Sequence, residues 1–315
     1  MEIASSIALL LVGLAVAIVA SDVAVRYTRA LAAGLGAPPF VVGVVLVAIG
    51  TDLPEIANSI SSHAQGEGDV NVGDSVGSTL TQYTLVLALF PLVIPVIAIS
   101  RRQVGLVTVL TMGGLGVTVL AVADGWLGRL DGLVLVVAWA VATLVVTRLL
   151  PGHEPDDPPG VRVDGTPGRV AVVLSTLLVV GAGATVAVRA LVDLAEAAGI
   201  PEFALAFFGA SLGTSAPEIA VDITALRQGA PAIALGDALG SSLIDATLSI
   251  GIGPLLFPAA VTADLAVTAA VYTLAAVGIV GAILVWRRRH DRWSAVALLG
   301  LYVLSYFVVL GADAD

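Results

Sequence analysis

A short motif that breaks a helix and carries a carboxylate occurs twice in this chain, each time within apolar sequence. Residues Gly50 to Glu55 read Gly-Thr-Asp-Leu-Pro-Glu, and residues Gly213 to Glu218 read Gly-Thr-Ser-Ala-Pro-Glu. A glutamate is costly in the hydrocarbon core of a membrane, and irregular backbone is tolerated there only where it lines a protein cavity. The two copies therefore predict a cation site that is built at the interface of an internal repeat.

The composition is that of a membrane protein with little else attached. Hydrophobic residues make up 58% of the chain and charged residues 12%, and the mean hydropathy is +1.04, whereas soluble proteins carry about 25% charged residues. One span needs roughly 20 apolar residues, so a chain of 315 residues has room for about ten spans. No separate extramembrane domain is expected.

The absence of cysteine limits the chemistry of any ion site. A chain with no cysteine forms no disulfide, no thiol nucleophile and no thiolate metal site. Its three histidines are scattered along the sequence. A bound cation must therefore be held by oxygen, which favours hard ions such as Na⁺, Ca²⁺ and Mg²⁺.

The apolar runs predict an all-α polytopic membrane protein with ten transmembrane helices. Their predicted bounds are 4–28, 38–62, 70–94, 103–123, 130–150, 168–191, 202–226, 231–256, 265–286 and 294–311. An acidic linker, residues 151–167, separates a first set of five helices in 1–150 from a second set in 168–315. Residues 1–20 are apolar, but they begin with Glu2 and lack a basic stretch, which argues against a cleaved signal peptide and for a first transmembrane helix.

The arginines predict the orientation. All 14 basic residues are arginine, and when the loops are assigned alternately to two sides, one side receives every arginine except Arg129 and Arg189. By the positive-inside rule the arginine-rich side is cytoplasmic. Both termini are then predicted to be extracellular and the linker cytoplasmic. The protein is expected to lie in a prokaryotic plasma membrane.

The two halves align without gaps at an offset of 163 residues, the separation of Thr51 from Thr214. Between positions 50 and 85, sixteen of 36 residues are identical to their partners. The repeated segments extend over about 38–90 and 201–255. Because each half contains an odd number of predicted spans, the second must enter the membrane from the opposite face. The halves are therefore predicted to be inverted repeats, as in transporters that work by alternating access.

The repeated motif offers three kinds of oxygen ligand. Pro54 and Pro217 lack an N–H and leave backbone carbonyls of the preceding turn without their helical donor. Threonine hydroxyls and the two glutamates add to these carbonyls, and this mixture is what Na⁺ and Ca²⁺ prefer. The alternative is a proline-kinked helix whose glutamate bonds a neighbouring span, which two symmetry-related copies make less attractive.

A second repeated segment follows the first in each half. Gly73 to Thr79 matches Gly236 to Ser242, and glycines four residues apart permit close helix contact. Ser78 and Ser241 come directly after these glycines and are within reach of the same cavity, although helix packing alone is an equal explanation. Asp74 and Asp237 lie near the predicted helix starts, where an N-cap role is at least as well supported as ion binding.

Both segments resemble the alpha-repeats of the cation/calcium exchanger superfamily, in particular its prokaryotic sodium/calcium exchangers. The resemblance implies a central cluster of four cation sites whose ligands fall on Ala48, Thr51, Asp52, Glu55, Ser78, Gln82, Ser211, Thr214, Ser215, Glu218, Ser241 and Asp245. Three positions depart from the usual pattern: Asp52 replaces serine, Gln82 replaces asparagine, and Ser211 is a mild change. Asp52 adds a fourth carboxylate to the cluster.

The resemblance implies a secondary active transporter that exchanges Na⁺ for Ca²⁺. A proton/calcium antiporter of the same fold is the alternative, favoured by Asp52, because like charges this close favour proton uptake. A channel usually needs several subunits around a pore, and a metalloenzyme would want histidine or a nucleophile beside the acids. We therefore expect no enzyme activity and no cofactor. The expected partners are Na⁺ and Ca²⁺ ions, with H⁺ as the alternative, and the lipid bilayer, with no nucleic acid, and function as a monomer.

Overall fold

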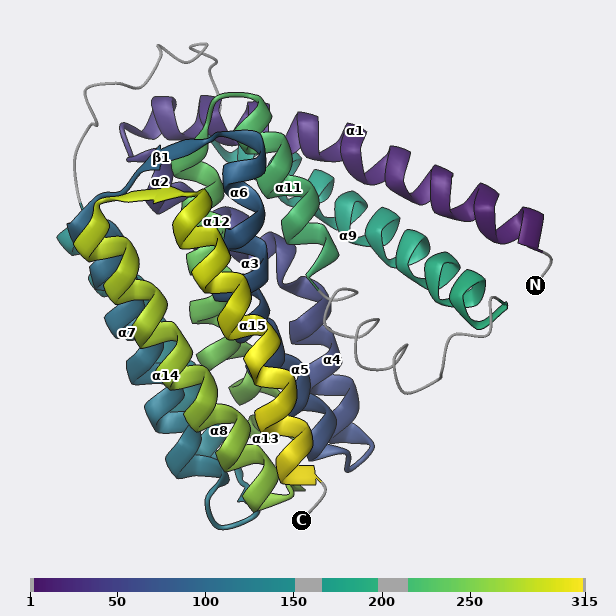
Figure 1. The fold of residues 1–315 in the computed structure, drawn as a ribbon, viewed down its shortest axis with the longest axis vertical. Helices are drawn as coiled ribbons and strands as arrows, with labels where there is room; N and C mark the ends of the chain where they lie inside the picture. The colour runs from purple at the N-terminus through teal and green to yellow at the C-terminus, as the bar shows by residue number, and fades with distance from the viewer. Residues whose placement is uncertain (1–2, 151–165, 198–214, 314–315) are drawn as a thin grey trace. The chain divides into compact units, whose positions relative to one another are not determined.

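The computed structural model describes residues 3–150, 166–197 and 215–313, and most of them are helical (Figure 1). Within these residues, seven helical segments are long and apolar enough to cross a membrane, or eight when one bent helix pair is counted as a span. The uninterrupted ones are α1 (Ile3–Leu35), α7 (Arg101–Val122), α8 (Arg129–Leu149), α9 (Thr166–Ala197) and α14 (Ala263–Arg287). A shorter apolar segment, Arg292–Val308, lies in α15 (Arg292–Asp313).

Most predicted spans lie close to these helices. The largest differences are at the ends of α1, which continues to Leu35 instead of residue 28, and of α9, which continues to Ala197 instead of residue 191. The predicted span 202–226 begins in the part of the chain outside the described residues, which contain only α11 (Ala216–Arg227) of it. The predicted linker also falls almost wholly outside them, so the total of ten spans stays a prediction.

The first copy of the motif breaks a helix, as expected. A helical run made of α2 (Pro39–Val42), the π-helical turn η1 (Gly43–Val47) and α3 (Ala48–Thr51) stops at Asp52, and α4 (Leu53–Ala64) begins directly after it. Asp52 has φ −81° and ψ 5°, and Ser215, its equivalent before α11, has φ −83° and ψ 5°. Asp52 and Ser215 therefore share one backbone conformation directly before a helix.

Two composite helices also match at the offset of 163. The first consists of α5 (Gly68–Thr81), η2 (Gln82–Val86) and α6 (Leu87–Val93). The second consists of α12 (Pro231–Ile244), η3 (Asp245–Ser249) and α13 (Ile250–Leu256). Each has a π-helical turn in the middle, and such turns are frequent at functional sites.

A proline in the last part of each composite helix leaves one carbonyl without its helical donor. Pro91 cannot donate to Leu87 O, and Pro254 cannot donate to Ile250 O. The Nε2 atom of His290 lies 2.7 Å from Leu87 O, and the Nδ2 of Asn71 donates to Ile250 O at 3.1 Å. Two side chains distant in the sequence thus supply the donors that the prolines remove.

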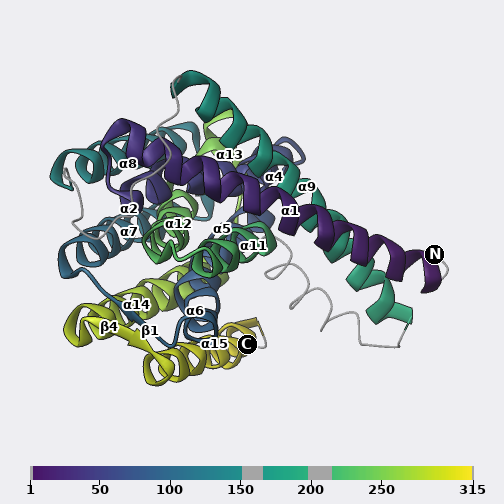
Figure 2. The same ribbon diagram turned by 90° about the horizontal axis from the view of Figure 1, so that it is seen from above.

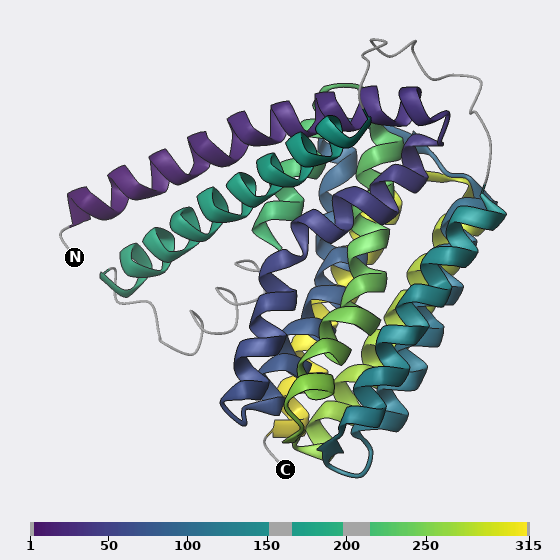
Figure 3. The same ribbon diagram turned by 180° about the vertical axis from the view of Figure 1, so that it is seen from behind.

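The described chain forms two compact units, and each takes residues from both halves of the sequence. Unit 1 is Met1–Leu53 with Gly152–Asp237, and unit 2 is Pro54–Pro151 with Ala238–Asp315. In unit 1, α1 and α9 lie side by side along their length (Figures 1 and 3). A Cβ on Gly13 would lie 2.6 Å from Gly183 O, so this contact requires glycine.

Unit 2 contains two short antiparallel ribbons that were not predicted. In one, β1 (Val96–Ala98) pairs with β4 (Arg289–Asp291), as Figure 2 shows; in the other, β2 (Trp126–Leu127) pairs with β3 (Ala259–Ala260). At the offset of 163, β1 is equivalent to β3 and β2 to β4. Each ribbon therefore joins a strand of one sequence half to a strand of the other.

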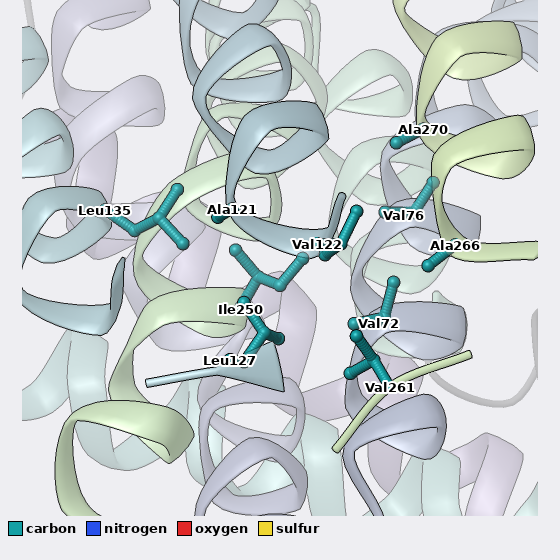
Figure 4. Packing of buried hydrophobic residues seen from close by; sticks show 10 residues of the cluster. All are labelled: Val72, Val76, Ala121, Val122, Leu127, Leu135, Ile250, Val261, Ala266 and Ala270. Carbon is teal, nitrogen blue, oxygen red and sulfur yellow. The ribbon is translucent and has the colours of Figure 1, made fainter. Parts of the chain in front are cut away.

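An apolar cluster packs beside the second ribbon in unit 2 (Figure 4). Leu127 and Val261, at the ends of β2 and β3, contact side chains of the surrounding helices. Those of the cluster are Val72, Val76, Ala121, Val122, Leu135, Ile250, Ala266 and Ala270. The glycines of this unit permit close contact as well, since a Cβ on Gly132 would lie 2.6 Å from Gly251 O.

We predict that His290 makes the stability of the protein sensitive to acid. Leu87 O can only accept, so Nε2 carries the proton, and Nδ1 lies 2.8 Å from Ser294 Oγ, whose single proton goes either to Nδ1 or to Asp291 O at 2.8 Å. Burial lowers the pKa of His290 below its ordinary value of 6.5, and Arg287 lowers it further, against the raising effects of Leu87 O and Asp291. The unfolded chain therefore binds more protons below about pH 6.5, and stability falls as the pH drops through that range.

The measurement is the melting temperature in detergent between about pH 8 and pH 5, for the wild type and for His290→Gln. Glutamine retains an N–H donor for Leu87 O but does not titrate in this range. The variant should lose less stability on acidification than the wild type. Parallel curves for the two proteins would show that His290 does not contribute.

Candidate functional site

Four of the predicted ligand residues lie in unit 1, at the break after α3 and at the start of α11. Thr51 ends α3, Asp52 occupies the break, Ser215 precedes α11, and Glu218 is in the first turn of α11. All four are buried, and a carboxylate oxygen of Asp52 lies within 4.8 Å of one from Glu218. The predicted ligand Ala48, at the start of α3, is buried in the same unit.

The Thr51 hydroxyl has three possible acceptors in unit 1. Its Oγ1 lies 3.3 Å from Val47 O, 3.2 Å from Ala48 O and 3.2 Å from Oδ1 of Asp237. A hydroxyl has one proton to donate. Donation to Asp237 would fix the direction of this hydroxyl, which is one of the predicted ligands.

The suggested N-cap role of the two repeated aspartates is wrong. Asp237 lies within α12, six residues after its first residue, and is fully buried. Asp74 lies within α5, whose N-cap is Glu67, and its Oδ2 accepts from Nδ2 of Asn58 at 2.6 Å. The predicted spans began at residues 70 and 231, and the observed helices begin at Gly68 and Pro231, so both aspartates lie more than a turn inside them.

Close packing brings Asp237 to Thr51. A Cβ on Gly43, in η1, would lie 2.6 Å from Ile233 O of α12. Small residues at a helix contact let the backbones approach. Gly236, the neighbour of Asp237, faces the same contact from α12, since a Cβ there would meet the backbone at Phe40. The aspartate can therefore reach the threonine hydroxyl.

Sequence reasoning missed Asp222. It lies on α11 one helical turn after Glu218, is fully buried, and has its carboxylate within hydrogen-bonding reach of Asp237. The signal was present, because an acid within an apolar span is a candidate functional residue. It was overlooked because its equivalent in the first half is Ser59, so the comparison of the two halves does not single it out.

The other described ligand candidates lie in unit 2, and all are buried. Glu55 is in the first turn of α4, Ser78 is on α5, and Ser241 is on α12. Gln82 and Asp245 are the first residues of η2 and η3. The amide and the carboxylate thus occupy equivalent positions at the two π-helical turns.

A serine that was not predicted positions the Gln82 amide. Ser242 Oγ lies 2.8 Å from Gln82 Oε1 and 2.8 Å from Ala238 O, and it donates its proton to one of them. Within the described part of the chain, Nε2 of Gln82 has no hydrogen-bond partner. Thr79, the equivalent of Ser242, donates to Ser75 O of its own helix at 2.9 Å.

Ser211 and Thr214 lie outside the residues that the structure describes. The candidates that it does describe offer carboxylate, hydroxyl, amide and carbonyl oxygens in buried positions. Such oxygens are ligands for hard cations. The chemistry available to this set is therefore the binding of hard cations rather than thiolate or imidazole coordination.

Comparison with known proteins agrees with this chemistry. The family model described as "Sodium/calcium exchanger protein" matches residues 5–148 and 169–311. The inner membrane protein YrbG of Escherichia coli K12 is 29% identical over 304 residues, which cover 93% of this chain and 92% of that protein. The sodium/calcium exchanger MaX1 of Methanosarcina acetivorans is 26% identical over 349 residues, covering 96% and 97%.

Solved structures show the same fold. A structure of the sodium–calcium exchanger NCX_Mj soaked with 10 mM Na⁺ matches with a TM-score of 0.79 at 20% identity, over 96% of this chain and 98% of that one. With the apolar helices described above, this likeness makes the chain a multi-pass, all-α membrane protein. The chain belongs to the sodium/calcium exchanger family, whose members are ion exchangers and therefore transporters rather than enzymes.

Proposed function

We propose that this protein is a secondary active transporter that exchanges Na⁺ for Ca²⁺ across the membrane. The observation that carries the proposal is the pair of buried carboxylates in unit 1, those of Asp52 and Glu218. One carboxylate oxygen of Asp52 lies within 4.8 Å of one of Glu218. Two carboxylates at this distance in an apolar interior repel each other unless a cation lies with them. The names of MaX1 and NCX_Mj, both sodium/calcium exchangers, support the choice of ions.

The proposed ligand set contains oxygens from both repeats. It consists of Ala48, Thr51, Asp52, Glu55, Ser78, Gln82, Ser211, Thr214, Ser215, Glu218, Ser241 and Asp245. Ca²⁺ takes six to eight oxygen ligands, which neither motif supplies alone. The four carboxylates of the set also suit a site that Ca²⁺ and several Na⁺ ions occupy in turn.

Transport then requires the site to open to the two sides alternately. Ten spans arranged as two inverted repeats provide this. Because the repeats have opposite orientations in the membrane, exchanging their conformations converts a protein that is open to one side into one that is open to the other. The shared backbone angles at Asp52 and Ser215 and the exchanged strands of the two ribbons support a repeat of this kind. We place both termini outside the cell, as the arginine distribution indicates.

Proton/calcium exchange is the second candidate, and Asp52 is the residue that favours it. A carboxylate in place of a hydroxyl can carry a proton as well as bind Na⁺. The two functions are separated by Ca²⁺ uptake into liposomes that contain the purified protein, driven either by a Na⁺ gradient or by a pH gradient. Uptake that follows the pH gradient alone would replace Na⁺ by H⁺ as the coupling ion.

We predict that Glu55 and Glu218 are both required for exchange. Each supplies a carboxylate that a neutral amide does not replace as a ligand for Ca²⁺. Radioactive Ca²⁺ uptake by reconstituted Glu55→Gln and Glu218→Gln should fall at least about tenfold, the effect of about 1.4 kcal/mol of lost binding free energy. Arg129→Gln, at the distant start of α8, serves as the control. Near-normal uptake by either glutamate variant would contradict a shared site.

The orientation predicts which loops face the outside. Glu67, before α5, and Arg289, in β4, are exposed, and the chain has no cysteine of its own. In intact cells, Glu67→Cys should react with a membrane-impermeant maleimide and Arg289→Cys should react only after permeabilisation. The opposite pattern would reverse the orientation. His290, next to Arg289, is unsuitable for this purpose because its side chain is buried.

We predict that Ser242 tunes the affinity for the transported ion through Gln82. Ser242→Ala removes the hydrogen bond to Gln82 Oε1. The amide then loses about 1 kcal/mol of the free energy that holds it in its binding orientation. The KM for Ca²⁺ uptake should then rise about fivefold while the maximal rate changes little. Thr79→Ala is the matched control, because its hydroxyl bonds its own helix. An equal change in KM for both variants would remove the positioning role.

A further inference from the structure

Unit 1 contains a second pair of buried carboxylates, which the proposed ligand set does not include. Asp222 on α11 and Asp237 on α12 are both fully buried, and their carboxylates lie within hydrogen-bonding reach of each other. The Thr51 hydroxyl lies 3.2 Å from Oδ1 of Asp237. The pair therefore lies directly beside one proposed ligand of the exchange site.

The protein supplies almost no donors to this pair. Among the described residues, neither oxygen of Asp222 has a hydrogen-bond partner, and neither has Oδ2 of Asp237. The ion pairs of the described chain join Arg26 to Asp22 and two arginines to Asp291, so no arginine neutralises Asp222 or Asp237. Burying one unpaired charge costs several kcal/mol, and two like charges in contact cost more.

The first repeat solves the same problem in a different way. Asp74, the equivalent of Asp237, accepts from the Asn58 amide at 2.6 Å. At the position equivalent to Asp222 it has Ser59, whose Oγ accepts from the backbone N–H of Gly253 at 3.0 Å. In the first repeat the aspartate is therefore satisfied by a protein donor. In the second repeat a carboxylate faces a carboxylate, and both need the same missing positive charge.

We infer that Asp222, Asp237 and the Thr51 hydroxyl form an additional site for a hard metal cation. The two carboxylates match the charge of a divalent ion such as Ca²⁺, and Na⁺ is the other ion of the proposed exchange that takes oxygen ligands. Thr51 is also one of the proposed ligands of the exchange site, so its hydroxyl belongs to both ligand sets. The inference concerns binding and stands whether or not the protein exchanges Na⁺ for Ca²⁺.

Asp222→Asn tests the additional site. The amide would donate to Asp237 as Asn58 donates to Asp74, so the variant reproduces an arrangement that this chain already contains. The number of ions bound per chain is measured on the purified protein in detergent, by equilibrium dialysis with radioactive Ca²⁺ in one arm and radioactive Na⁺ in the other. We expect the variant to bind one ion fewer than the wild type in at least one arm.

Asp74→Asn is the matched control and should bind as many ions as the wild type, because Asp74 already has an amide donor. Asp222→Ser, which introduces the residue of the equivalent position 59, repeats the test with a smaller side chain, and gel filtration verifies the folding of each variant. An unchanged number of bound ions in both arms, for either folded variant, would overturn the inference and leave a shared proton as the neutralising charge. Uptake into liposomes is measured separately, so a failure of exchange is not mistaken for a failure of this site.

Discussion

A carbonyl that loses its helical donor inside a membrane must be given another partner, and four prolines impose this requirement on the chain. Pro91 and Pro254 each free one carbonyl, which His290 and Asn71 satisfy from distant segments. Pro54 and Pro217 likewise cannot donate to the carbonyls four residues before them, Gly50 and Gly213, which directly precede the predicted ligands Thr51 and Thr214. We expect a bound cation to satisfy such a carbonyl together with the neighbouring carboxylates. On this view, the same loss of a backbone donor is met by a side chain at one place and by an ion at the other.

The acids of unit 1 follow the same reasoning. Asp52, Glu218, Asp222 and Asp237 are all buried in one compact unit. A transporter tolerates such a concentration of like charge because its ions supply the opposite charge. The empty state is correspondingly less favourable than the occupied one. Ion binding shifts a conformational equilibrium only by as much as this repulsion differs between the two conformations.

Much of the fold and part of the site could be predicted from sequence. The bounds of the helices follow from apolar runs, and the break at Asp52 follows from the motif. The full lengths of α1 and α9 could not be predicted in this way. In α1, the charged residues that suggested its end form an ion pair and a hydrogen bond within unit 1. Arg26 pairs with Asp22, and Arg29 donates to the carbonyl of Gln228. The donors His290 and Asn71 were also missed, since a contact between residues so distant in the sequence leaves no local signal.

The repeats share a backbone but divide their charged residues differently, and this explains both the success and the failure of comparing the halves. Glu55 and Glu218 occupy equivalent positions and were found at once. Asp52 is equivalent to Ser215, Asp222 to Ser59, and Asp245 to Gln82. At each of these three pairs one repeat has an acid and the other a neutral polar side chain. Two of the three acids fall in the second repeat, and the neutral partners Ser59 and Gln82 are both engaged by hydrogen bonds. Equivalent positions therefore need not be equally charged for the backbone to be alike, since Asp52 and Ser215 have nearly the same φ and ψ although only one of them is an acid.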